Sequence, residues 1–281
     1  MMLCHVTPKP EALTGSLKCQ IDQTNLRLVV SDYPRGLEVE TTCDLITLAK
    51  LYGLEKIWLW AFLEDVPEFL KVGFQFEGTI DDNRRDKPTA SLAYYVQSER
   101  SLSKNLQSEK EILQQITTRK VEPLSPLRKG MTLRLLDIGD SFAVSCLLRD
   151  VFTSYPTQVE DTGYIQKLMT NGCIFAGAFY DQKLVSVAAA YPEQKWLRCE
   201  ITDCATRPEY RGHSLTERLI KMLEPVIDKK GAYTLYTLAR ATSYGINRVF
   251  YRLGYRFQGR LINNCHIAGD FEDMNLWVRY R

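Results

Sequence analysis

The sequence predicts an α/β protein of the α+β type, in which a mixed, mostly antiparallel and twisted sheet is flanked by helices. Short apolar runs with strand character alternate with segments that have the hydrophobic spacing of amphipathic helices. The chain has 281 residues, of which 45% are hydrophobic and 11% aromatic. This composition supports the core of one large domain or of two ordinary ones.

Residues 1–97 predict a smaller N-terminal α/β domain. The segment at 44–53 has helical spacing and ends in a glycine, and the apolar segment KIWLWAF at 56–62 predicts a buried strand. Residues 66–80 predict a short helix followed by a strand, and a further strand is expected at 90–96. Helix and strand therefore alternate along this part of the chain.

Residues 98–130 predict a helical linker. The stretch is charged and rich in Ser and Gln, with a helix expected to about Thr118 and two prolines, Pro123 and Pro126, after it. We therefore place a domain boundary here. The alternative is a solvated helix inside one larger domain.

Residues 131–281 predict a second, larger domain with the element order β-α-α-β-β-β-α-β-α-β-β. Three strands joined by short polar turns predict an antiparallel meander that leads into the longest helix. That helix ends at the signal KKG at 229–231 and carries one apolar stripe. The stripe consists of Leu215, Leu219, Met222, Leu223 and Val226.

Two parts of the chain resemble each other. The segment FLKVGFQFEGTI, which starts at Phe69, aligns with FYRLGYRFQGRL, which starts at Phe250. KIWLWA precedes the first copy and TLYTLA the second, and SLAYYV and NLWVRY follow them. We hypothesise that the N-terminal domain is a reduced copy of the C-terminal part of the larger domain. The alternative is a coincidence between two amphipathic helix-turn-strand units.

The charge and the cysteines exclude several classes of protein. Thirty-six basic and thirty-four acidic residues give a formal charge of +2 without a basic block, which argues against a nucleic-acid binder. The eight cysteines form no Cys-x-x-Cys pair, and none of the three histidines has a second ligand at metal-binding spacing. We expect reduced thiols and no metal.

The start of the chain carries no targeting signal that we can identify. The segment MMLCHVTPKPEALTG lacks the apolar core and basic flank of a signal peptide, and no run approaches the ~20 apolar residues that span a bilayer. We expect a cytoplasmic protein without a membrane association.

A phosphate-binding turn is predicted where the meander meets the long helix, in CATRPEYRGHSLTERLI. A helix N-terminus offers free backbone N–H groups and the positive end of the helix dipole, which together favour an anion. Gly212 lets the backbone approach closely, and Arg211 supplies a permanent cation. The alternative is an ordinary capped turn with a solvated arginine.

Residues 131–281 resemble the GNAT superfamily of acetyltransferases, whose acyl-CoA motif Arg/Gln-x-x-Gly-x-Gly/Ala is matched by residues 211–216. Ser214 and Thr216 stand where that motif has small residues. The resemblance implies direct attack of an amine on acetyl-CoA in a ternary complex. It implies that the acyl-CoA contacts are Cys204, Ala205, Thr206, Arg211, Gly212, His213, Ser214, Leu215, Thr216, Asn247 and Phe250.

A narrower resemblance covers nearly the whole chain and is strongest from Glu200 to Tyr280, in EITDCATRPEYRG, GRLINN and MNLWVRY. These segments are similar to the beta-lysine N-acetyltransferases, which make N-epsilon-acetyl-beta-lysine. The resemblance implies a small-molecule amine substrate, a lysine 2,3-aminomutase as pathway partner, and a compatible solute as product with a part in osmoadaptation. A homodimer is left open.

Aminolysis of a thioester needs a neutral amine, whereas a lysine-like amine with a pKa of about 10.4 is mostly protonated at pH 7. Glu200, four residues before Cys204, is our candidate base, and the alternative is a strand glutamate in a surface ion pair. Asp203 lies nominally on the opposite face, but a bulge of the kind common in the superfamily would turn it into the cleft to hold an ammonium.

The remaining chemistry has weaker candidates. Backbone N–H groups at residues 204–206 are the expected oxyanion donors, and Cys204 is expected to be a wall residue and not a nucleophile. Phe250 stands where the family has a tyrosine that acts as general acid, so either Tyr251 or water protonates the leaving thiolate. The alternative for Tyr251 is an amphipathic surface tyrosine.

A substrate with one carboxylate and two amines needs a cation at one end and acceptors at the other. Arg240, just past a strand, is our candidate for the carboxylate, and its alternative is a structural ion pair. The candidates for the amines are Asn263, Asn264, Glu272 and Tyr155.

Two other functions stay open. One is a GNAT enzyme that acts on another small amine or on a protein lysine. The other is a non-catalytic acyl-CoA-binding regulator, which the departures at Ser214, Thr216 and Phe250 from the superfamily pattern suggest.

Overall fold

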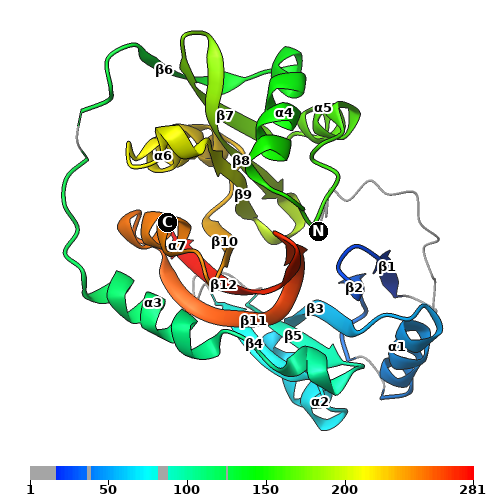
Figure 1. The fold of residues 1–281 in the computed structure, drawn as a ribbon. Coiled ribbons are helices and arrows are strands. Elements are labelled where there is room, and N and C mark those ends of the chain that lie inside the picture. Colours follow the sequence, from blue (N-terminus) through cyan, green and yellow to red (C-terminus); the bar gives the residue numbers. More distant parts are fainter. Residues whose placement is uncertain (1–16, 37–38, 82–87, 125) are drawn as a thin grey trace.

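The computed structural model describes residues 17–36, 39–81, 88–124 and 126–281. The N-terminal segment MMLCHVTPKPEALTG and residues 82–87 lie outside these ranges. Figure 1 shows the elements of the first half of the chain, in blue and cyan, beside the orange and red strands that end the chain.

In the described part of the chain, the strands are β1 (Lys18–Asp22), β2 (Arg27–Asp32), β3 (Lys56–Phe62), β4 (Gln75–Ile80), β5 (Thr89–Tyr95), β6 (Met131–Leu136), β7 (Ile174–Tyr180), β8 (Lys183–Glu193), β9 (Arg198–Thr206), β10 (Thr234–Arg240), β11 (Arg256–Ile267) and β12 (Asp270–Tyr280). The α-helices there are α1 (Val39–Leu51), α2 (Val66–Lys71), α3 (Leu106–Thr118), α4 (Ser141–Val151), α5 (Thr162–Thr170), α6 (Leu215–Lys229) and α7 (Tyr244–Arg252). The predicted element order of the second half is confirmed.

One continuous sheet runs through both halves of the chain. Its twelve strands follow the order β1-β2-β3-β5-β4-β11-β12-β10-β9-β8-β7-β6. The pairs β2–β3 and β9–β10 are parallel, and the other neighbours in the described sheet are antiparallel. The mixed, mostly antiparallel sheet is therefore as predicted.

The sequence analysis missed the first two strands. β1 and β2 form an antiparallel pair in which Cys19 lies opposite Val30, and β2 then pairs with β3. Their apolar runs are only a few residues long, and strand pairing over a distance of some thirty residues leaves no local periodicity to detect.

The two halves repeat the same order of elements, as the alignment suggested. The run β1-β2-α1-β3-α2-β4-β5 has the same order and the same strand pairings as β8-β9-α6-β10-α7-β11-β12. The bulge between Phe76 and Gly78 in β4 recurs between Phe257 and Gly259 in β11. Gly78 and Gly259, which are aligned in sequence, face each other where β4 meets β11. The N-terminal half therefore has the topology of the C-terminal part of the second half.

The linker helix α3 packs on the second half. Its Ile116 is fully buried in the same hydrophobic cluster as Leu219 and Trp277. Arg248 on α7 donates hydrogen bonds to the carbonyl oxygens of Ile116 and Arg119. This helix therefore covers one side of α7.

The apolar stripe of α6 is shifted from the predicted one. Leu215, Leu219 and Leu223 are buried as expected, together with Ile220 and Ile227, whereas Met222 and Val226 are only partly buried. The helix faces the sheet strands β7, β8 and β9, and its N-terminus is left at the edge of the site.

Candidate active site

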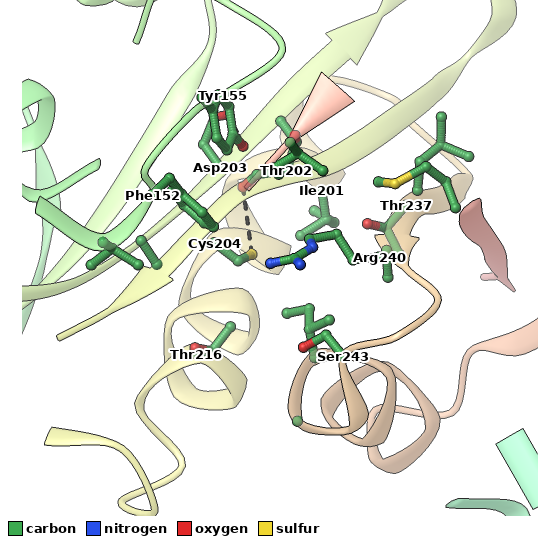
Figure 2. A pocket seen from close by; sticks show the side chains of 18 of the residues that line it. Phe152, Tyr155, Ile201, Thr202, Asp203, Cys204, Thr216, Thr237, Arg240 and Ser243 are labelled. Atoms are coloured by element: carbon green, nitrogen blue, oxygen red, sulfur yellow. Dashed lines mark hydrogen bonds between the residues drawn. The ribbon is translucent and has the colours of Figure 1, made fainter. Parts of the chain in front are cut away.

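A cavity of about 720 Å³ lies where strands β9 and β10 diverge. The two strands pair only through Arg198–Thr234, Cys199–Leu235 and Glu200–Tyr236. Beyond Glu200 they separate, and the space between them is bounded by the N-terminus of α6, by α7, by β11 and by residues 151–157. Figure 2 shows side chains from these elements converging on the cavity. A splayed sheet thus creates the site at the point where its pairing stops.

The phosphate-binding turn forms one end of the cavity. Gly212 has a φ of +85° and Ser214 a φ of +54°, so the backbone turns through two left-handed residues just before α6. Ser214 makes no side-chain cap to the helix, and Arg211 is oriented by a 3.3 Å hydrogen bond that its Nε donates to the Thr206 carbonyl. The first turn of α6 therefore keeps its backbone N–H groups for an anionic group.

Most of the predicted acyl-CoA contacts lie together on this wall. The cavity is lined by Cys204, Ala205, Thr206, Arg211, Gly212, Ser214, Leu215, Thr216 and Phe250. His213 is not among the lining residues. Ser214 adopts the left-handed conformation that glycine would favour at this position of the motif. The turn therefore keeps its backbone conformation despite the departure from the motif.

Strand β9 carries the bulge that would bring Asp203 into the cleft. Ala189 on β8 pairs with Thr202 and Val187 with Ala205, so two residues of β9 lie opposite Ala188. Asp203 has a φ of +47° and lines the cavity. Its carboxylate accepts a 2.8 Å hydrogen bond from the Tyr155 hydroxyl and another from Tyr191. Burial raises the pKa of Asp203, and these two hydrogen bonds oppose the increase.

Glu200 lies on the same strand at the apex of the splay and lines the cavity. The Tyr236 hydroxyl lies 3.3 Å from Glu200 Oε2 and 2.7 Å from Glu193 Oε1. Because one hydroxyl has one proton, the shorter bond goes to Glu193. Burial, together with the charges of Glu193 and Asp203, raises the pKa of Glu200 to about 8. A carboxyl group with this pKa can exchange a proton with an amine near neutral pH.

Cys204 follows Asp203 and also faces the cavity. Burial and the charge of Asp203 raise the pKa of its thiol well above the ordinary range, so the reactive thiolate is scarce. Its Sγ lies 3.5 Å from the Thr202 carbonyl oxygen, a contact drawn in Figure 2. This environment suits a wall residue and not a nucleophile.

Two predicted contacts on α7 point elsewhere. The Tyr251 hydroxyl donates a 3.0 Å hydrogen bond to the Thr117 carbonyl of α3, and the residue does not line the cavity. Asn247 is fully buried, and its amide donates to the carbonyls of Arg240 and Ser243 while its Oδ1 accepts from Trp277. The predictions of Tyr251 as general acid and of Asn247 as a CoA contact are therefore corrected. Tyr251 is hydrogen-bonded to α3, and Asn247 is hydrogen-bonded to Trp277 of the sheet.

Replacing Tyr251 by phenylalanine is expected to leave kcat unchanged and to lower stability by about 1 kcal/mol, the net contribution of one hydrogen bond. The reason is that the lost bond joins α7 to α3 outside the cavity. Steady-state kinetics and thermal unfolding check this result. A fall in kcat of tenfold or more without a matching loss of stability would restore Tyr251 as the general acid.

The predicted substrate contacts divide in the same way. Tyr155, Asn264 and Arg240 line the cavity, whereas Asn263 and Glu272 do not. The Asn263 amide donates to the carbonyls of Arg100 and Leu102, so its role is structural.

Arg240 is less available than the sequence analysis expected. Both Nε and Nη2 of its guanidinium donate to the carboxylate of Glu272, which also accepts a hydrogen bond from Thr242. The alternative that we left open for Arg240, a structural ion pair, describes this geometry. Glu272 is thereby corrected from a substrate contact to the partner of Arg240.

The contribution of the N-terminal half to this cavity was not predicted from the sequence. Arg27 on β2 and Trp58 on β3 line it, together with Tyr191 on β8 and Phe152 after α4. Arg27 and Trp58 are more than 140 residues from Glu200, and no local pattern signals contacts across such a distance.

Two further observations describe the molecule. Among the described residues there is no group of three or more His, Cys, Asp and Glu side chains placed to hold a metal ion. The helices of the described chain are too short or too polar to cross a bilayer.

The chain is similar to known acetyltransferases. The sequence model of the acetyltransferase (GNAT) family matches residues 143–255. N-acetyltransferase YodP of Bacillus subtilis is 34% identical over 258 residues, which are 92% of this chain and 94% of that protein. The beta-lysine N(6)-acetyltransferase of Methanosarcina mazei is 35% identical over 195 residues, 69% of this chain and 72% of that protein. The protein of the same name from Methanococcus maripaludis is 28% identical over 211 residues, 75% and 77% of the two chains.

The alignment with YodP covers 92% of this chain and so includes both halves, and the family match spans the splayed strand β9, the predicted phosphate-binding turn and α7. The expected donor of the acetyl group, acetyl-CoA, follows from the same match. The chain belongs to the acetyltransferase (GNAT) family and is an acetyltransferase that uses acetyl-CoA.

Proposed function

We propose that this enzyme transfers the acetyl group of acetyl-CoA to the ε-amine of β-lysine (3,6-diaminohexanoate) and releases N-epsilon-acetyl-beta-lysine. The similarity to two enzymes named for this reaction supports the substrate. The observation that carries the chemistry is Glu200, a carboxyl group with a pKa of about 8 that lines the same cavity as the uncapped N-terminus of α6.

In this proposal Glu200 accepts the proton of the substrate ammonium, directly or through one water molecule. The neutral amine then attacks the thioester carbonyl, a C–N bond forms and the C–S bond breaks. Backbone N–H groups at residues 204–206 stabilise the negative charge that develops on the carbonyl oxygen. Water protonates the departing thiolate, because Phe250 has no proton to give and the Tyr251 hydroxyl is bound to Thr117.

Asp203 holds the amine end of the substrate in this proposal. Its carboxylate is surrounded by the hydroxyl groups of Tyr155 and Tyr191, and all three residues line the cavity. A buried anion within a ring of aromatic side chains is a favourable place for an ammonium group. A cavity with walls from both halves of the chain favours a small molecule over a protein lysine.

We also propose that residues 1–97 form a domain that completes the substrate end of this cavity, with 98–130 as linker and 131–281 as catalytic domain. The cytoplasmic location, the lysine 2,3-aminomutase as pathway partner and the role of the product as a compatible solute stay predictions. Their support is chemical: acetylation removes one positive charge and leaves a net-neutral zwitterion, which adds little charge to screen. A homodimer likewise stays a prediction.

A thiol-release assay with acetyl-CoA tests the proposed reaction. β-Lysine is expected to be turned over faster than α-lysine and simple diamines, and mass spectrometry of the product is expected to place the acetyl group on the ε-nitrogen. Turnover of a different amine would support the alternative of another acetyltransferase activity. Binding of acetyl-CoA without turnover of any amine would support the regulator and reject the enzyme.

A further inference from the structure

We propose that Arg27, supplied by the N-terminal half of the chain, binds the carboxylate of the amine substrate and so selects amino acids over simple diamines. This inference rests on the proposed function, because it concerns the far end of the same substrate. It replaces Arg240, whose guanidinium is occupied by Glu272.

Arg27 is held rigidly with one face toward the cavity. The residue is only 4% exposed, yet it lines the cavity. Its Nε donates a 2.9 Å hydrogen bond to Asp22, and its Nη1 donates a 3.0 Å hydrogen bond to the Asn264 carbonyl. The guanidinium lies 5.1 Å from the centroid of the Trp58 ring, which lines the same cavity. Nη2 has no hydrogen-bond partner among the described residues.

The counterpart of Arg27 in the catalytic half is buried away from the cavity, although its Nη2 also lacks a hydrogen-bond partner. Arg198 begins β9 as Arg27 begins β2, and each Nε binds a carboxylate five residues earlier, Glu193 or Asp22. Arg198 also donates from Nη1 to Thr89, and it does not line the cavity. The same structural position therefore serves packing in one half and faces a substrate-sized space in the other.

A second group beside Arg27 lacks a partner. The side-chain oxygen of Asn264 is buried without a hydrogen bond, although the residue lines the cavity and its backbone carbonyl holds Arg27. A buried polar atom without a partner costs stability unless a ligand or water satisfies it. The 3-amino group of β-lysine lies close to its carboxylate along the chain and would reach both groups, since the amide oxygen accepts from an ammonium and the guanidinium donates to a carboxylate.

The two ends of the cavity are then complementary to a diamino acid. Glu200 and Asp203 on β9 take the amine that is acetylated, and Arg27 and Asn264 take the carboxylate and the second amine. The first pair comes from the catalytic half, whereas Arg27 crosses from the N-terminal half. The N-terminal half thus supplies the cation for the substrate carboxylate, which the catalytic half alone does not provide.

The test compares each substrate with its carboxylate-free analogue: β-lysine with 1,4-diaminopentane, and α-lysine with 1,5-diaminopentane. Arg27→Met is expected to lower kcat/KM for β-lysine by about 100-fold, the cost of removing one partner of a buried carboxylate contact. Its effect on 1,4-diaminopentane is expected to be small, so the preference for the amino acid disappears. Arg27→Lys is expected to retain part of the preference, because it keeps the charge and loses the planar fork.

Arg100→Met is the matched control. Arg100 is a buried arginine that pairs with Glu55 and stacks on Phe271 without lining the cavity. Its loss is expected to lower stability without altering the ratio of kcat/KM between a substrate and its analogue. Thermal unfolding and acetyl-CoA binding, measured for all three variants, separate misfolding from a loss of recognition.

An Arg27→Met enzyme that binds acetyl-CoA but loses activity equally on both members of a pair would overturn the inference. So would a wild-type enzyme with no preference for the carboxylate in either pair. A preference for α-lysine over 1,5-diaminopentane that depends on Arg27, together with no turnover of β-lysine, would support the inference and reject β-lysine as the substrate.

Discussion

Replacing Glu200 by glutamine is expected to lower kcat by about 10²–10⁴-fold, the usual contribution of a positioned general base. Glutamine has the same shape as glutamate, but it cannot take a proton. The fold and the binding of acetyl-CoA should therefore survive. Thiol release under saturating acetyl-CoA, with thermal unfolding as a check on the fold, measures the effect.

The pH dependence gives the sharper evidence. Burial raises the pKa of Glu200 to about 8, so the carboxylate that acts as base predominates above this pH. The kcat/KM of the wild type should rise tenfold per pH unit below pH 8 and level off above it, because kcat/KM reports the ionisation of the free enzyme. The pH profile of Glu200→Gln should lose this rise below pH 8 and show only the titration of the substrate amine.

Glu160→Gln is the control for this prediction. Glu160 is an exposed glutamate before α5 and does not line the cavity, so its kcat and pH profile should match the wild type. A Glu200→Gln enzyme that keeps both its rate and its rise below pH 8 would exclude Glu200 as the base and turn attention to Asp203.

Replacing Gly259 by alanine is expected to destabilise the protein by about 3 kcal/mol or more, at the upper end for overpacking. A Cβ atom at this position would overlap the Glu77 carbonyl oxygen and the Gly78 Cα, and it would lie 2.9 Å from the Glu77 carbonyl carbon. These are backbone atoms, which cannot rotate away as a side chain can. β4 and β11 would have to separate at the point where the two halves of the sheet meet.

Gly254→Ala is the control for Gly259→Ala, because it introduces backbone strain without a steric clash. Gly254 has a φ of +82°, and nothing lies within 4 Å of a Cβ placed there. Its replacement should cost only about 1–2 kcal/mol, the penalty of a left-handed residue. Chemical denaturation of both variants measures the difference. Equal losses would mean that β4 and β11 can move apart at little cost.

Local pattern was sufficient for much of the fold. The stretch after Gly130 alternates between strand and helix with clear turns and caps, so its element order was predicted in full. The turn at Gly212 and the base candidate Glu200 could be proposed from the sequence, because both depend on their place along one strand-turn-helix segment, and their roles stay predictions. β1 and β2 were missed because they are short, and because β2 pairs with β3 across the intervening helix α1.

The periodicity of a helix did not predict which way its side chains face. Tyr251 and Asn247 lie on α7, but α3 approaches one side of that helix and the sheet the other. Spacing gives angles between neighbouring residues of a helix and not its rotation against its surroundings. Asn263 lies on strand β11, where the alternation of a strand likewise does not show which distant segment a side chain meets; its amide donates to the backbone carbonyls of Arg100 and Leu102.

The sequence by itself determined the element order of the acetyltransferase half, and it placed the predicted anion-binding turn and the carboxylates of β9 together within residues 200–216. Only the tertiary structure decided what faces them. The sheet joins β4 to β11 and places Arg27 and Trp58 on the wall of a cavity that opens beyond Glu200. Contacts between residues more than 140 positions apart depend on how whole elements pack, and this information is spread over the complete chain.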